Sequence, residues 1–429
     1  MSAVGITLLI SLGICLIAGV PIALSMAGAS FLALLTSDAL PMGLFIQRMY
    51  TATDSFPLMA IIFFCIAGEL MLQGGISRRL INFALSLLGG LRGSLAMVAV
   101  VTCAFFGAIS GSAYATVAAI GGIMYPEMVK NGYKEDFTAT LMASSGMLGI
   151  LIPPSIPLVV YGVVAGVSIG DLFIGIISAG ILFTVAYCVT AQIVIRKEDM
   201  APLSSNPEKV SFIKSFKEAF WGLMSPVIIL GGIYSGVFTA TESAIIASVY
   251  SLFIGFFVYR ELNWENLIQA MGKSVIAASS IMFIVGGVQL FTWILSYEKI
   301  AQALSTFLIS LTNSKITFLL IVNVIYLIAG MFIDTTSSVM LIVPLLLPVA
   351  NYYGVDLLHL GLLTVCNLAV GLITPPFGGN LFVSASVSRV PVNKMYRCII
   401  PFIIAGFTVT LVVTYFPAMT VGLLALLKG

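Results

Sequence analysis

Long apolar stretches separated by short polar breaks dominate the sequence. A membrane-spanning helix needs about 20 mainly apolar residues. Six stretches clearly reach that length: 56–74, 137–168, 171–195, 274–296, 358–388 and 398–427. Two others, 3–36 and 221–259, are long enough for two short passes each, with breaks expected at Gly19 to Pro21 and near Thr239 to Glu242. The pattern predicts about ten passes and an all-α polytopic membrane protein.

Two further apolar regions, 92–129 and 315–350, are interrupted by polar clusters at Gly107 to Ser112 and Asp334 to Ser338. A first half ending near residue 106 would reach only roughly 20 Å into a core about 30 Å thick. Each region is therefore predicted to be a re-entrant hairpin whose tip lines a site within protein or water. The returning half points a positive dipole end inward, so we expect Ser110 and Ser112 to help hold an anion.

Two of the spans each contain a Pro-Pro pair, Pro153–Pro154 and Pro375–Pro376. Two consecutive prolines remove hydrogen-bond donors, so each helix should break there and leave carbonyls unpaired at a negative dipole end. A structural kink is the plainer interpretation of one pair. Its recurrence beside a second polar cluster favours two cation sites suited to Na⁺, flanking one substrate site.

The two halves of the chain are related by one constant shift along the sequence. It places Pro126 on Pro348, Gly132 on Gly354, Gly149 on Gly371, and the first Pro-Pro pair on the second. This predicts repeat 1 at 1–195, a cytoplasmic linker at 196–220 and repeat 2 at 221–429. Because the first hairpin should open inward and the second outward, the arrangement is an inverted repeat. Amphipathic stretches at 77–91 and 298–313 fit interfacial helices, either as arms joining a moving block to a frame or as plain surface helices.

Composition and charge support this class. Hydrophobic residues make up 60% and charged residues 8% of the 429 positions, whereas a soluble domain has about a quarter charged. A net charge of +2 gives no basic field for nucleic acid. Of the 19 Lys and Arg residues, all but Arg48, Lys299, Lys315 and Lys428 fall on the predicted inner side. Both termini are therefore expected on the outer side of the membrane.

A few polar residues stand apart within the apolar regions. A carboxylate inside a hairpin is costly, so Asp334 is interpreted first as a substrate or cation residue and second as a cap of the tip. Capping or scaffold pairing is at least as good an explanation for Glu69 and Glu242. Ser110 beside Gly111 would need a base at membrane depth to act as a protease nucleophile. Because His359, the one histidine, lies at a span edge, an enzyme is rejected.

Several motifs together carry a family resemblance: Gly236 to Ala244, Gly107 to Ala113 with Ala115 and Thr116, Leu151 to Ser155, Asp334 to Thr336, and Thr374 to Pro376. With them the chain resembles, end to end, the large membrane subunit of the tripartite ATP-independent periplasmic (TRAP) transporters. The resemblance implies an elevator-type sodium symporter for small organic acids. It also implies two partners, a four-helix small membrane subunit and a periplasmic substrate-binding protein. The small subunit is expected as a separate chain because this one starts in its own first span.

The resemblance also implies specific ligands, mostly main-chain oxygens for Na⁺. These cation positions are Gly107, Ser110, Gly149, Ile152 and Pro154 in repeat 1, and Gly330, Gly371, Thr374 and Phe377 in repeat 2. Ser110, Ser155 and Asp334 resemble substrate-region residues of the family. Ser112, Thr335 and Asn380, at the tips and the second break, complete the predicted substrate set.

Two alternatives remain open at this stage. One is a sodium/dicarboxylate symporter that needs no binding protein, which would have the same inverted hairpins. The other is a channel, which would lack alternating access. No arginine is available within the membrane for a bidentate grip on a carboxylate. Recognition by hydroxyls and half-helix ends therefore fits C4-dicarboxylates, sugar acids and sialic acid about equally, and lipid is the only other expected contact.

Overall fold

The computed structural model describes residues 2–37, 40–89, 93–198, 200, 211–422 and 424, and every element within these ranges is helical. Eight of the described helices are long and apolar enough to cross a membrane, or nine if one bent pair counts as a single span. The prediction of an all-α polytopic membrane protein is confirmed. The count is below ten partly because the two helices within 3–36 are only 15 and 14 residues long.

The helices of the first half run in this order: α1 (Ala3–Ile17), α2 (Ile22–Leu35), α3 (Gly43–Thr53), η1 (Phe56–Leu58), α4 (Met59–Gln73), α5 (Ile76–Leu88), α6 (Ser94–Ser110), α7 (Ala113–Lys130), α8 (Glu135–Gly146), α9 (Leu148–Leu151), α10 (Ile156–Ala165) and α11 (Ile169–Lys197). The second half contains α12 (Phe212–Tyr234), α13 (Ala240–Phe253), η2 (Ile254–Val258), α14 (Trp264–Tyr297), α15 (Ile300–Leu311), α16 (Lys315–Phe332), α17 (Thr335–Tyr352), α18 (Leu357–Gly371), α19 (Gly379–Ser388), α20 (Val392–Tyr415) and η3 (Pro417–Met419).

The constant shift that relates the two sets of motifs relates these helices as well. The shift that carries Pro126 onto Pro348 also carries α7 onto α17 with matching first and last residues. It carries the α3–η1–α4 segment onto the single long helix α14. The repeat inferred from a few prolines and glycines therefore extends through the helix boundaries of both halves.

Several elements differ from those expected. Helix α3 was not predicted, because Gln47 and Arg48 interrupt its apolar pattern. Helix α12 begins at Phe212, inside the stretch assigned to the linker, while residues 201–210 lie outside the described part of the chain. The last helix ends at Tyr415 instead of near residue 427, and Pro417 follows directly in a 3₁₀ turn.

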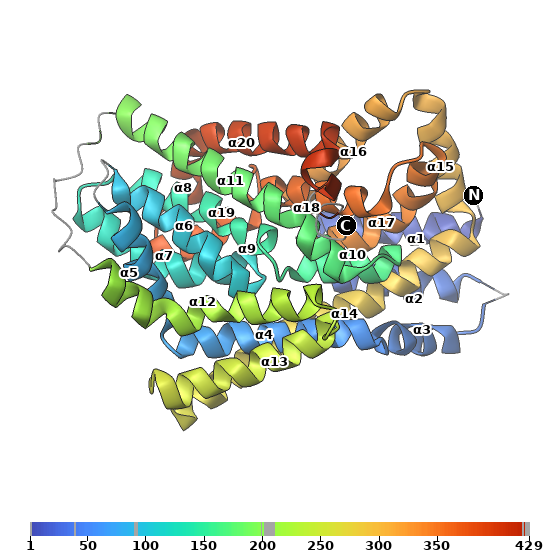
Figure 1. Ribbon diagram of the computed structural model, residues 1–429. Coiled ribbons are helices and arrows are strands. Elements are labelled where there is room, and N and C mark those ends of the chain that lie inside the picture. The colour runs from blue at the N-terminus through green and yellow to red at the C-terminus, as the bar shows by residue number, and fades with distance from the viewer. Residues whose placement is uncertain are drawn as a thin grey trace.

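The scaffold helices of each repeat pack against those of the other repeat. Helix α4 packs against α13 of the other repeat, and α14 packs in the corresponding way against α2. The amphipathic stretches form α5 and α15, which lie at opposite ends of the molecule in Figure 1. Helix α5 contacts both α6 and α12, and α15 contacts both α17 and α14, so each joins a hairpin to a scaffold helix.

The hairpins and broken helices also pair across the repeats. Helix α7 packs on α19, and α17 packs on α10. The Tyr161 hydroxyl donates to the carbonyl of Leu357 at 2.6 Å, and the Ser384 hydroxyl donates to that of Ala139 at 2.6 Å. The two hairpins and the two broken helices thus form one packed block.

Candidate functional site

The first hairpin turns at Gly111 and Ser112, between α6 and α7. Gly111 has a φ of +62°, which favours glycine, and a Cβ there would lie 2.9 Å from the carbonyl oxygen of Pro154. Ser112 caps α7 by accepting a hydrogen bond from the N–H of Ala115 at 3.4 Å. The hydroxyls of Ser110 and Thr116 lie 3.1 Å apart and are buried. The tip therefore carries hydroxyls at the start of a helix, as predicted.

The first half of this hairpin is longer than the sequence indicated. Helix α6 continues to Ser110, so Gly107 lies inside the helix and not in the turn. The reason is tertiary packing, because a Cβ at Gly107 would lie only 2.8 Å from the Cα of Gly149. Gly107 is a close-contact position between two helices, where a small residue lets the backbones approach.

The first broken helix is interrupted at residues 152–155, between α9 and α10, and its two parts, Glu135–Leu151 and Ile156–Ala165, meet at a bend of 42°. Pro153 and Pro154 have no N–H for the carbonyls of Gly149 and Ile150, four residues earlier. The buried Ser155 hydroxyl donates to the Ile150 carbonyl at 2.7 Å instead. The break is tied to the hairpin tip, because the N–H of Ile156 donates to the carbonyl of Gly111 at 3.3 Å.

The second broken helix repeats this construction with different donors. Pro375 and Pro376 deny an N–H to the carbonyls of Gly371 and Leu372. The carbonyl of Gly371 accepts from the N–H of Thr374 at 3.0 Å, and that of Leu372 accepts from the N–H of Asn380 at 3.0 Å.

The residues on either side of Pro375 and Pro376 also have defined contacts. The Thr374 hydroxyl donates back to Val370 at 2.7 Å. Phe377 is 54% exposed and its ring contacts that of Phe332, so its part in a cation site stays a prediction.

A glycine pair also brings the second hairpin against its broken helix. A Cβ at Gly330 would lie 2.9 Å from the Cα of Gly371, and one at Gly371 would lie 2.5 Å from the Cα of Gly330. The main chain of α16 therefore runs directly against the end of α18, as α6 runs against α9 in the first repeat. All the predicted glycine positions of the two cation sites belong to these two contacts.

The tip of the second hairpin is capped by a carboxylate. Asp334 is the N-cap of α17, where one oxygen accepts from the N–H of Ser337 at 3.0 Å and the other from its hydroxyl at 2.5 Å. Thr335, the next residue, is buried. The tip is held to the second break because the N–H of Gly378 donates to the carbonyl of Met331 at 3.2 Å. The capping role of Asp334 is thus visible, and a role toward substrate or cation stays a prediction.

Asn380 connects the second break to the first repeat. It is fully buried, and its amide nitrogen donates to the carbonyl of Ala143 at 3.0 Å, while its amide oxygen is buried without a partner among the described residues. Its neighbour Gly379 lies against Tyr114 of the first tip, since a Cβ there would clash with the phenol oxygen. Tip 1, break 1, break 2 and tip 2 are therefore joined in one continuous region. Sequence reasoning missed Tyr114, because its contact with Gly379 joins segments far apart in the sequence and no local pattern encodes it.

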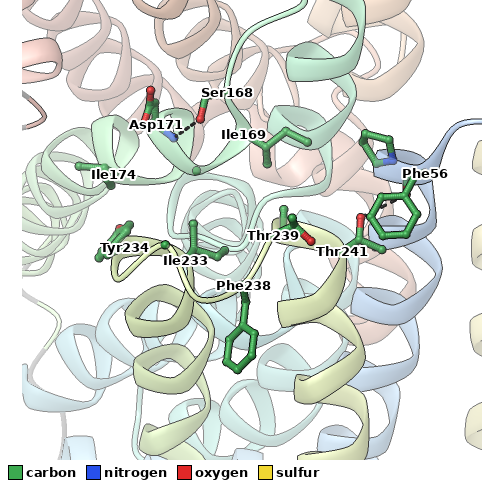
Figure 2. Close-up of a pocket in the computed structure, with 14 residues that line it drawn as sticks. Phe56, Ser168, Ile169, Asp171, Ile174, Ile233, Tyr234, Phe238, Thr239 and Thr241 are labelled. Atoms are coloured by element: carbon green, nitrogen blue, oxygen red, sulfur yellow. Dashed lines mark hydrogen bonds between the residues drawn. The ribbon is translucent and has the colours of Figure 1, made fainter. Parts of the chain in front are cut away.

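The largest cavity of those described lies elsewhere. It has a volume of about 600 Å³ and is lined by the turn between α10 and α11, by η1, and by the turn between α12 and α13. Figure 2 shows Thr239 and Thr241 on one side, facing Ser168 and Ile169. Thr239 and Glu242 form a capping box, which confirms the capping interpretation of Glu242. No predicted site residue lines this cavity. Its lining includes part of the Gly236 to Ala244 motif, which therefore lies at a junction between the block and the scaffold.

Comparison with known proteins gives a consistent result. A family model described as "Tripartite ATP-independent periplasmic transporter, DctM component" matches residues 9–419. The C4-dicarboxylate TRAP transporter large permease protein DctM of Pseudomonas aeruginosa is 39% identical over 376 residues, which is 88% of each chain. The sialic acid TRAP transporter large permease protein SiaM of Vibrio cholerae is 36% identical over 96% of this chain and 97% of its own.

Two further matches extend the comparison. The isethionate TRAP transporter permease protein DctMQ of Oleidesulfovibrio alaskensis is 39% identical over 94% of this chain, which spans only 64% of that relative's length. The crystal structure of the Alcanivorax borkumensis YdaH transporter has a TM-score of 0.64 over 88% of both chains at 14% identity, and so shares the fold. The three relatives named are TRAP transporter permease proteins and not enzymes.

Proposed function

We propose that this chain, which belongs to the DctM family of tripartite ATP-independent periplasmic transporters, couples the entry of a small organic acid to a sodium gradient. The family carries out secondary transport of organic acids, and the chain is a multi-pass inner-membrane protein. The observation that carries the sodium proposal is the duplicated contact of a hairpin glycine with the end of a broken helix, Gly107 with Gly149 and Gly330 with Gly371. Each contact lies where proline removes the donor for a main-chain carbonyl, which is the kind of oxygen that coordinates Na⁺ in discontinuous helices.

The substrate would sit between the two tips. Ser110, Ser112 and Ser155 supply hydroxyls on one side, and Asp334, Thr335 and Asn380 lie on the other. An acid bound there would face the N-terminal ends of α7 and α17, whose positive dipole ends favour an anion. The named relatives handle isethionate, C4-dicarboxylates and sialic acid, so we propose a small organic acid of this range.

Movement of the packed block against the frame is the proposed route across the membrane. Helices α6–α10 and α16–α19 form the block, α1–α4 and α12–α14 form the frame, and α5 and α15 each contact both. We propose further that the chain works with a small membrane subunit and a periplasmic binding protein, and that both termini are periplasmic. The charge asymmetry supports that orientation: a thiol at position 351, at the end of α17, should react with an impermeant reagent on intact cells. The matching inner position, Asn206, lies outside the described residues.

Reconstitution tests the proposed function directly. The chain is placed in proteoliposomes with its small subunit, and uptake of isethionate, succinate and sialic acid is measured with and without the cognate binding protein and an inward Na⁺ gradient. Concentrative uptake of one of these acids is expected only when both are supplied. Robust uptake without any binding protein would assign the chain to the binding-protein-independent symporters instead.

A further inference from the structure

One arginine of the frame stacks on a tryptophan. Arg48 is on α3, and it is one of the few cations that the charge pattern places on the outer side. It is half-buried, and its guanidinium carbon lies 4.6 Å from the centroid of the Trp293 ring on α14. Contact of a cation with an aromatic face is favourable. Trp293 stacks in turn on Tyr297, with 5.4 Å between ring centroids and 22° between the ring planes. The guanidinium is therefore held in one place against α14.

This contact leaves the N–H groups of the guanidinium available. The two ion pairs among the described residues join Arg79 to Glu261 and Lys134 to Glu198, so neither involves Arg48. Arg48 offers five N–H donors in a planar fork, which matches the two oxygens of a carboxylate or a similar oxyanion. A ring contact occupies the face of the guanidinium and not its edge. The arrangement is therefore suited to bind an anion.

Trp293 lines a cavity between the frame and the block. The cavity has a volume of about 410 Å³, which is within the size range of small-molecule sites. It follows α14 from Val285 to Ser296, about 16 Å of helix, and Trp293 lies near its outer end. Arg48 lies beside this end, because Thr51, which also lines the cavity, is one turn later on the same face of α3.

The block side of the cavity is apolar and approaches the proposed substrate region. Val160, on α10, lies five residues after Ser155, and Met340, on α17, lies five residues after Thr335. Five residues of helix span about 7.5 Å. The cavity thus connects the surroundings of Arg48 with the block just beyond break 1 and tip 2.

The polar lining of the cavity favours an anion over a cation. Three lining hydroxyls already donate to main-chain carbonyls of their own helices: those of Thr51, Thr292 and Ser296. The other polar lining groups are the Gln289 amide and the Trp293 indole, and both carry N–H donors. None of the lining residues is acidic. Arg48 adds a positive charge to a cavity that otherwise has only neutral donors.

The stacked pair is not part of the repeated plan. The shift that relates the two repeats carries Arg48 onto Ala270 and Trp293 onto Met71, and both counterparts are buried apolar residues. The scaffold therefore packs without such a pair at the equivalent positions. This difference favours a role for the pair on the outer side alone.

We propose that Arg48, held by Trp293, forms an entrance subsite that binds the oxyanion group of the organic acid before the acid reaches the hairpin tips. The guanidinium grips two oxygens, and the Gln289 amide supplies a further donor. Because Arg48 belongs to the frame, the acid leaves it when the block takes the acid up. The entrance role rests on the proposed function and on the orientation predicted from the charges, whereas anion binding at Arg48 does not.

Trp293 itself reports on this subsite. Trp221→Phe and Trp264→Phe leave it as the single tryptophan of the chain. This parent chain is placed in phosphatidylcholine bicelles with choline salts at constant ionic strength. Quenching of its fluorescence by iodide is divided by quenching by neutral acrylamide, so the ratio reports local positive charge and not accessibility. The ratio is measured against increasing isethionate, succinate and sialic acid.

In the parent chain, at least one acid should lower the ratio severalfold and saturably, because it displaces iodide from the guanidinium. Arg48→Gln should start from a low ratio that no acid changes. Arg48→Lys keeps the charge but loses the fork, so about tenfold more acid should be needed. Lys299→Asn removes another exposed outer cation, two residues beyond Tyr297, and should behave as the parent chain.

Equal protection in Arg48→Gln, or no effect of any of the three acids on the parent chain, would overturn the proposal. So would loss of protection when phosphatidylglycerol replaces part of the phosphatidylcholine, since the guanidinium would then bind a lipid phosphate. The quenching needs no Na⁺ and no binding protein, so its result is independent of sodium-coupled uptake. In reconstituted uptake, Arg48→Gln should raise the acid concentration for half-maximal rate severalfold. A fall in maximal rate alone would contradict an entrance role.

Discussion

The two repeats share a backbone plan but place their acids differently. Ser112 caps the first tip, and its counterpart in the second repeat, Asp334, caps the second. The first tip instead faces Glu69 of the frame, whose own counterpart under the same shift is Phe291, buried in α14. Each hairpin thus has one carboxylate near its tip, carried by the hairpin in one repeat and by the frame in the other. Glycine and proline preserve the shared backbone geometry, while the carboxylates make the two hairpin tips chemically distinct.

The glycine contacts should be the most sensitive positions, and equally so in both repeats. Gly107→Ala and Gly371→Ala would each place a Cβ within 3 Å of the facing glycine. Overpacking of this kind costs about 1–3 kcal/mol, and the block should lose its cation geometry, so uptake should fall at least about tenfold.

Gly122→Ala and Gly272→Ala are matched controls, because nothing lies within 4 Å of an added Cβ at either position. Both should transport normally. If only one member of the sensitive pair lost uptake, the two contacts would not be functionally equivalent.

The prolines come next. Pro154→Ala and Pro376→Ala restore an N–H that can donate to Ile150 or Leu372, so the helix can re-form through the break and shift the neighbouring main-chain oxygens of the proposed cation sites. We expect the Na⁺ concentration for half-maximal uptake to rise roughly three- to tenfold in each, equivalent to about 1 kcal/mol of lost coordination. Sodium titration of initial rates checks this, and an unchanged sodium dependence in both variants would remove the breaks from the cation sites.

The contrast between the tips predicts a split between stability and transport at Asp334. Asparagine and serine are good N-caps, whereas alanine costs about 1 kcal/mol of helix stability. Asp334→Asn and Asp334→Ser should therefore unfold at nearly the native temperature but lose most uptake, and Asp334→Ala should lose both. Full uptake by Asp334→Asn would reduce the residue to a cap.

The smallest effects are expected at the hydrogen bonds that join the two repeats. Tyr161→Phe removes the hydrogen bond to Leu357, and Ser384→Ala removes the one to Ala139. A single hydrogen bond contributes about 0.5–1.5 kcal/mol, so both variants should lower the unfolding temperature slightly and to a similar extent. A large loss in one alone would show that the block is held mainly from one side.

Sequence patterns could predict the architecture because glycine and proline act locally. The paired prolines placed both breaks within a few residues, and the polar clusters placed the two tips. Contacts between residues far apart in the sequence could not be predicted from these local patterns. From sequence alone Gly107 is interpreted as a helix breaker, whereas the structure shows that it is a close contact with Gly149. Helix α3 was not predicted because Gln47 and Arg48 interrupt its apolar pattern. The surroundings of Glu69, whose Oε2 is buried without a hydrogen-bond partner among the described residues, depend on where the hairpin rests against the frame, which no local pattern encodes.

The ratio of sodium to substrate flux tests the central claim that each repeat supplies a cation site. It can be obtained from the membrane potential at which net substrate flux reverses, in proteoliposomes that contain the chain, its small subunit and the binding protein. Two equivalent sites predict at least two Na⁺ per substrate molecule. Uptake that continues unchanged when choline replaces Na⁺ at constant pH would contradict the account.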